Sequence, residues 1–248
     1  MTNNLSLSTF WNSAPSGQDM FHADRILSLP KAAQRYLRHA IAPESRLASA
    51  VRLRMHGEIK IKRWLPFVAE QVIRWDRGMI WQATARMAGL PIRGWDRLVD
   101  GEGAMRWKLF GIIPVMTASG PDISRAAAGR LMAESIWLPS VLCITDVSWT
   151  EPEPLRLHAE LAVHDETAKL ELATDDAGRL KSVKLSRWGN PEGAEFRYVD
   201  FGGLVEEEGT FGGFTIPIRM RVGWYFGSSR FESEGEFFRV TIDDAIYR

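Results

Sequence analysis

Arg130 and Glu134 are the two residues whose types and spacing could do chemistry. They lie four positions apart in a segment, residues 120–137, that is otherwise mostly apolar. Side chains four apart on a helix lie on one face, so this guanidinium and this carboxylate are expected to meet there. An ion pair is costly to desolvate. The pair therefore either fixes the helix structurally or supplies polar groups to an apolar cavity, and both interpretations stay open.

The tryptophans are the second group of candidates. Ten of the 248 residues are Trp, whereas only four are Tyr. Trp81, Trp107 and Trp224 fall on the apolar positions of alternating segments, and Trp137 ends the apolar segment of Arg130 and Glu134. Large amphipathic rings at such positions either pack a core or line a cavity for an aromatic or acyl ligand.

Three functions are compatible with these residues. The leading prediction is a protein that binds a hydrophobic small molecule, acyl chain or lipid, with Arg130 pairing with an anionic head group and the tryptophans contacting the apolar body. The alternative is an enzyme without cofactor, in which Glu134 acts as acid or base with a pKa tuned by burial and by Arg130. A third is a structural or interaction protein without a ligand. We lean away from an enzyme.

Metal and cofactor chemistry are not expected. His158, Glu160 and His164 share one side of a strand, but six residues separate the histidines, roughly 20 Å at about 3.3 Å per residue. The sequence holds no Gly-rich phosphate loop, no GxSxG, no HExxH and no Cys/His cluster. Cys143 is the single cysteine, so neither an internal disulfide nor a thiolate zinc site can form.

Period-two alternation of apolar and polar residues dominates the rest of the chain and predicts strands. About ten or eleven strands are expected, joined by short connections rich in Gly, Pro or Asp. Because no regular helix lies between strands, parallel βαβ units are not expected. The clearest alternating segments cover residues 51–55, 79–87, 105–109, 157–163 and 216–224.

The helix of residues 120–137 must position the charged pair. Ser119 is expected to cap it, Pro121 suits its first turn, and Pro139 follows its end. It is apolar nearly all round, which predicts burial on both sides. The predicted fold is mainly β (α+β), a large curved antiparallel sheet or half-barrel with this helix in its concave side.

The remaining segments complete the predicted organisation. Residues 1–19 are expected to form a flexible tail, and residues 20–248 a single β-rich domain. That domain would include an N-terminal helix over residues 21–41, interrupted by Pro30.

Charge and hydropathy narrow the partners. Lys plus Arg and Asp plus Glu number 31 each, which argues against nucleic acid or an anionic membrane as partner, although local basic patches are compatible with it. Residues 1–20 lack the pattern of a signal peptide, and no window reaches about 18 apolar residues. We therefore predict a cytoplasmic protein without a membrane span. The sequence does not indicate an oligomeric state.

Several longer motifs stand out, namely Asp100-Gly101-Glu102-Gly103-Ala104-Met105-Arg106-Trp107, Ile113-Pro114-Val115, Ser119-Gly120-Pro121-Asp122, Ala133-Glu134-Ser135, Arg187-Trp188-Gly189-Asn190-Pro191, Thr210-Phe211-Gly212-Gly213-Phe214-Thr215-Ile216-Pro217 and Glu236-Phe237-Phe238-Arg239. Together they resemble a bacterial family described only as a domain of unknown function, over roughly residues 45–248. The resemblance implies no activity, ligand or catalytic residue.

The expected fold is also similar to the half-barrel of bacterial lipoprotein carriers, which a cofactor-free pigment-biosynthesis enzyme uses too. This likeness concerns the fold and does not decide the function. Those carriers are exported, whereas this chain shows no export signal.

Overall fold

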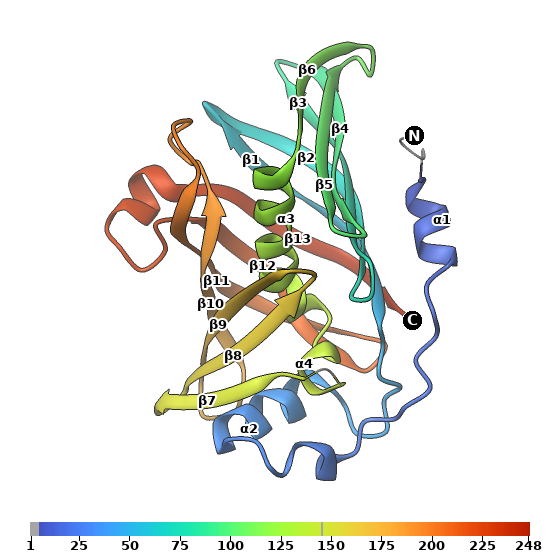
Figure 1. Ribbon diagram of the computed structural model, residues 1–248, viewed down its shortest axis with the longest axis vertical. Coiled ribbons are helices and arrows are strands. Elements are labelled where there is room, and N and C mark those ends of the chain that lie inside the picture. Colours follow the sequence, from blue (N-terminus) through green and yellow to red (C-terminus); the bar gives the residue numbers. More distant parts are fainter. Residues whose placement is uncertain (1–4, 145) are drawn as a thin grey trace.

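The computed structural model describes residues 5–144 and 146–248, and its described part contains one antiparallel sheet of thirteen strands (Figure 1). The strand order is β6-β5-β4-β3-β2-β1-β13-β12-β11-β10-β9-β8-β7. The predicted mainly β fold with a large curved antiparallel sheet is thus confirmed, with more strands than expected. The strands are β1 (Ala50–Ile61), β2 (Arg63–Arg74), β3 (Gly78–Met87), β4 (Leu90–Val99), β5 (Glu102–Leu109), β6 (Ile113–Ser119), β7 (Ser148–Glu153), β8 (Arg156–Val163), β9 (Glu166–Thr174), β10 (Leu180–Gly189), β11 (Arg197–Phe211), β12 (Phe214–Trp224) and β13 (Glu236–Tyr247).

The sheet is built from two meanders joined by the last strand. Strands β1 to β6 pair in chain order on one side, and β7 to β12 pair in chain order on the other. Strand β13, which follows a short π-helical turn η3 (Phe231–Gly235), pairs with both β1 and β12. The two halves therefore meet at β13, in the middle of the sheet.

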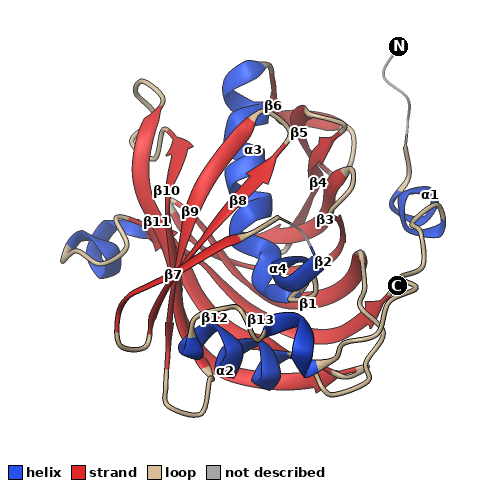
Figure 2. Ribbon diagram, turned by 60° about the horizontal axis from the view of Figure 1, so that its bottom comes forward, coloured by secondary structure: helices blue, strands red, loops and turns tan. Residues whose placement is uncertain are grey.

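The hollow of the curved sheet holds helix α3 (Pro121–Ala133), which continues as the 3-10 turn η2 (Glu134–Trp137) (Figure 2). The expected helix of residues 120–137 is present, but its last turn is 3-10. Burial on both sides holds only for its second half, where residues 131–137 are all buried. Asp122 and Arg125 near its start are exposed.

The predicted cap by Ser119 is wrong. Ser119 is the last residue of β6 and pairs with Ala104, so it belongs to the strand. Gly120 takes the N-cap position with φ 109°, a conformation that costs glycine little and lets the chain turn from strand into helix. Pro121 occupies the first turn, as expected.

Alternation explains why the strands face as they do. In β8, Leu157, Ala159, Leu161 and Val163 are buried against the concave side. In β3, the odd-numbered residues from 79 to 85 are buried, and they face α3. Apolar residues at every second position thus line the hollow, as the period-two pattern predicts.

Four short helical segments lie at the margins. Segments η1 (Ala23–Ile26) and α2 (Lys31–Ala40) are separated by residues 27–30, with Pro30 as the N-cap of α2, and α4 (Val141–Ile144) follows η2. Helix α1 (Leu7–Asn12) lies within the stretch that was expected to be a flexible tail. Its Phe10 is fully buried and packs with Val72 and Ile80 on the convex side of the sheet. Within the described part of the chain, no helix has the length and apolarity that crossing a membrane requires.

Candidate functional site

A cavity of about 300 Å³ lies between the end of α3 and the concave face of the sheet. Its residues come from both meanders, from β13 and from α3–η2. Most are apolar, namely Ile59, Trp81, Met105, Ala133, Ile136, Trp137, Val183, Phe201, Met220, Val222, Trp224, Phe237 and Phe238. Four charged residues also line it, namely Asp96, Arg130, Glu134 and Arg187. An apolar cavity with a few charged groups has the composition of a ligand site.

Arg130 and Glu134 meet as their spacing predicted. Arg130 Nε donates to Glu134 Oε1 at 2.7 Å, and its Nη1 donates to Asp96 Oδ2 at 3.2 Å. Its guanidinium lies 5.2 Å from the centre of the Trp81 ring. Arg130 is thus shared between two carboxylates and stacked on an indole.

Both carboxylates have further hydrogen-bond donors. Gln71 Nε2 donates to Glu134 Oε2 at 2.5 Å, and Trp107 Nε1 donates to Asp96 Oδ1 at 2.9 Å. Every carboxylate oxygen of Asp96 and Glu134 therefore accepts a hydrogen bond from the protein. This arrangement meets the requirement that buried charges be both paired and hydrogen-bonded.

Arg187 is bound quite differently. Its Nε donates to the carbonyl of Ala126 at 3.1 Å, and its guanidinium lies 4.5 Å from the Phe201 ring centre and 5.1 Å from that of Trp224. No described residue forms an ion pair with it, and its two terminal nitrogens donate to no described acceptor. The cavity therefore contains a cation whose terminal N–H groups donate to no described residue.

The electrostatics differ accordingly. Burial, together with the nearby Arg130, lowers the pKa of Arg187 to about 9. Burial also opposes the charge on Arg130, but Glu134 and Asp96 outweigh it, and the pKa of Arg130 is raised. The pKa of Asp96 is raised by burial, against the opposing effect of Arg130. Arg130 is thus compensated by its neighbours, whereas Arg187 is not.

The glycine at position 129 explains how Arg187 reaches the cavity. A Cβ at Gly129 on α3 would lie 3.0 Å from Cγ of Arg187. The missing side chain thus leaves room for the Arg187 stem to cross the helix closely. This is one of the positions where glycine permits close approach rather than a turn.

Three of the four predicted tryptophans line the cavity. Trp81, Trp137 and Trp224 contribute to its wall, and the indole N–H of Trp137 donates to the carbonyl of Pro217. The indole N–H of Trp81 has no acceptor among the described residues. Trp107 does not line the cavity: its ring packs on Gly94 and beside Trp81, and it holds Asp96.

Asp96, Arg187 and the phenylalanines were not predicted from the sequence. The alternation of β10 could have identified Arg187, because Val183 and Leu185 of the same parity are buried. Asp96 shares the parity of buried Ile92 and Leu98 in β4. Asp96 and Arg187 are both charged residues at inward-facing positions of a strand, and this is the sequence signal that could have identified them.

The histidines of β8 lie as expected. His158 and Glu160 occupy the positions that alternate with the buried residues, and His164 follows the strand with φ 53°. In the described ranges, no three His, Cys, Asp or Glu side chains are grouped so that they could hold a metal ion.

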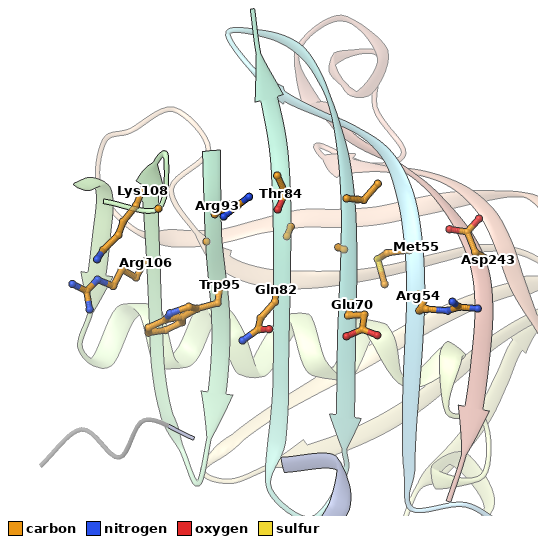
Figure 3. A pocket seen from close by; sticks show the side chains of 15 residues that line it. Arg54, Met55, Glu70, Gln82, Thr84, Arg93, Trp95, Arg106, Lys108 and Asp243 are labelled. Carbon is orange, nitrogen blue, oxygen red and sulfur yellow. The ribbon is translucent and has the colours of Figure 1, made fainter. Parts of the chain in front are cut away.

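A second hollow, of about 900 Å³, lies on the opposite, convex face (Figure 3). It is wide and open, and it is lined by residues of β1 to β5 and by Asp243 of β13, including the outward-pointing Arg93, Trp95 and Arg106. Open, solvated walls do not surround a ligand, so the smaller concave cavity is the better candidate site.

Comparisons with known proteins identify a family and find two solved structures of limited similarity. A family model described as a family of unknown function (DUF6920) matches residues 27–247. No curated protein matches the chain. A LolA superfamily protein from Nitrosomonas europaea has a similar structure with a TM-score of 0.45 and 9% identity, over 88% of this chain and 92% of that chain.

An outer membrane lipoprotein-sorting protein domain from Vibrio parahaemolyticus gives a TM-score of 0.44 and 11% identity, over 81% of this chain and 86% of that chain. The resemblance to a domain of unknown function that the sequence predicts is thereby confirmed. The predicted likeness to lipoprotein-carrier half-barrels extends to these two structures, at TM-scores below 0.5. The predicted cytoplasmic location is corrected, because sorting of outer membrane lipoproteins points away from the cytoplasm. We do not retain that prediction.

Proposed function

Because the chain belongs to the family of unknown function DUF6920, which provides no activity to start from, we propose a function from the cavity itself. The protein binds a small amphiphile that has an apolar body and one anionic group. The apolar body lies among the aromatic residues of β11 to β13, and the anion pairs with Arg187.

Arg187 is the observation that supports this function. The formal charges of the two arginines and two carboxylates in the cavity sum to zero, but Arg130 forms ion pairs with both carboxylates. The terminal nitrogens of Arg187 remain available, and a guanidinium binds a carboxylate or phosphate through two parallel hydrogen bonds. The role that the sequence suggested for Arg130 therefore passes to Arg187, while Arg130 and Glu134 shape the wall.

The rest of the cavity suits an apolar body. Phe201, Trp224, Phe237 and Phe238 form a chain of ring contacts along its wall. At about 300 Å³ the cavity lies at the lower end of the range for ligand sites, about 300–1,000 Å³, so one small amphiphile fits better than a large lipid. Arg187 is partly exposed, which suits a head group near the opening.

The cofactor-free enzyme has no comparable support. Both oxygens of Glu134 accept hydrogen bonds, from Arg130 and Gln71. A carboxylate held on both oxygens is poorly placed to exchange a proton with a substrate. We therefore keep binding as the proposed function.

Titration with decanoate and with decanol, followed by calorimetry and by tryptophan fluorescence, tests the proposal. The two probes share an apolar chain and differ in charge. A charge-assisted hydrogen bond contributes about 1.5–3 kcal/mol, so the wild type should bind decanoate about tenfold to a hundredfold more tightly. Arg187→Met should bind the two probes equally.

Arg219→Met is the matched control, because Arg219 lies on β12 and forms an exposed ion pair with Glu207. It should retain the preference for decanoate. A folded wild type that binds neither probe would refute the proposed function, and an Arg187→Met variant that keeps the preference would refute the role of Arg187.

A further inference from the structure

Three hairpin turns lie at one end of the first meander. The β1–β2 turn follows Ile61, the β3–β4 turn follows Met87, and the β5–β6 turn follows Leu109. Because neighbouring strands are antiparallel, alternate turns share an end of the sheet, here the upper part of Figure 1. The β2–β3 and β4–β5 turns lie at the other end.

These turns expose large apolar side chains to an unusual degree. We call them the tip residues: Ile61, Leu90, Phe110, Ile112, Ile113, Val115 and Met116. Ile112 is 73% exposed and Ile113 is 57% exposed. Large exposed apolar side chains gathered at one end of a globular protein indicate an interaction site.

The last hairpin is exposed along its whole outer strand. Strand β6 is an edge strand, and its residues 113 to 117 are all exposed. A bulge interrupts its pairing with β5, so that Ile113 pairs with Leu109 and Met116 pairs with Trp107. Paired residues share a face of the sheet, so Ile113 and Met116 present apolar groups on the same side, and no described segment covers them.

The charges around the tips have one sign. Residues 59–63, 84–94 and 105–118 contain seven Lys or Arg and no Asp or Glu, in a chain whose formal net charge is zero. The seven are Lys60, Lys62, Arg63, Arg86, Arg93, Arg106 and Lys108. None of them forms an ion pair with a described residue. Figure 3 shows Arg93, Arg106 and Lys108 along the outer side of β4 and β5.

We propose that this end of the sheet docks on an anionic lipid surface, with the tip residues entering the apolar layer and the seven cations contacting the lipid phosphates. The tip residues lie at or next to the turns, and cations such as Arg93 and Arg106 lie further along the strands. A bilayer presents its apolar layer and its phosphates in this order. The surrounding cations complement the anionic head groups, whose attraction for a Lys or Arg near the surface is well established. This docking is independent of the cavity and of Arg187.

Vesicle flotation tests the docking. Vesicles of phosphatidylcholine alone are compared with vesicles that also contain phosphatidylglycerol, at low and high salt. The wild type should float with the anionic vesicles only, and salt should weaken its binding. Each neutralised cation, for example in Arg106→Gln or Lys108→Gln, should lower the partition coefficient about fivefold.

Ile112→Asp combined with Ile113→Asp should abolish flotation. Both residues are exposed, so the fold should persist, which an unchanged melting temperature would verify. Leu27→Asp is the apolar control, because Leu27 is 59% exposed and lies outside the three turns. Lys169→Gln is the charge control, because Lys169 is exposed on β9 and has no ion pair with a described residue.

Two results would overturn the docking. One is a folded wild type that stays unbound to anionic vesicles at low salt. The other is a wild-type dimer in analytical ultracentrifugation that the double variant loses, since the tips would then be covered by a second copy. Arg187→Met should float like the wild type, so failure of the cavity and failure of the docking remain distinguishable.

Discussion

Arg130 and Arg187 line the same cavity, yet their partners give them different roles. Arg130 binds Glu134 and Asp96 and stacks on Trp81, whereas Arg187 rests on two aromatic rings and binds one backbone carbonyl. Removing the side chain of Arg130 leaves the two carboxylates of Asp96 and Glu134 buried without their cation. Removing that of Arg187 leaves no charge unpaired. The two arginines should therefore separate stability from binding.

Arg130→Met is expected to destabilise the protein by about 3 kcal/mol, at the lower end of the cost of breaking a buried ion pair. The low end applies because Asp96 keeps part of its surface in water, with its side chain 21% exposed. Urea denaturation measures the change. Adding Asp96→Asn and Glu134→Gln to the variant should restore most of the loss, because the stranded charges are then gone. An Arg130→Met variant as stable as the wild type would show that the ion pairs of Arg130 with Asp96 and Glu134 are not buried.

Prediction from sequence succeeded where the contacting residues belong to one helix or strand. The pair of Arg130 and Glu134 was found because a helix places residues four apart on one face. Asp96 and Arg187 were missed because their partners lie on α3 and on neighbouring strands, and the pairing of strands is not readable from one strand. Trp107 was assigned to the cavity on parity alone, which cannot distinguish a wall residue from one behind it.

Helices and strands were likewise predicted only where the sequence of the element itself reveals which face is buried. Strands with one buried face, such as β3 and β8, have the alternation that predicts them. Strand β6 has no such pattern, because nearly all its residues are exposed. Residues 7–12 of α1 were expected to be part of a tail, and six residues are too few for a helix to be stable without tertiary packing. Phe10 provides that packing.

Phe10→Ala should therefore release α1 from the sheet. Phe10 is fully buried, and Arg74 lies over its ring and donates to its carbonyl. Loss of a buried Phe side chain costs about 3 kcal/mol or more. Urea denaturation and amide hydrogen exchange of residues 7–12 would measure it. Trp11→Ala, at a half-buried neighbour, should cost less, and equal effects of the two changes would contradict this packing.

At the scale of the whole molecule, the cavity depends on the closing strand. Residues of β1, β3, β4 and β5 approach it from one meander and those of β10 to β12 from the other, and β13 brings the two together. The sequence predicted a curved sheet around a helix, but not the strand order that places Asp96 and Arg187 in one cavity. The neutral net charge likewise concealed the seven cations near the hairpin turns, because acidic residues elsewhere balance them.

A crystal structure of the protein with decanoate tests the proposed binding most directly. We expect the decanoate carboxylate on the terminal nitrogens of Arg187 and the chain among Phe201, Trp224, Phe237 and Phe238. The contacts of Arg130 with Asp96 and Glu134 should be unchanged. Decanoate held at Arg130 in place of Asp96 or Glu134, or found only outside the concave cavity, would contradict it.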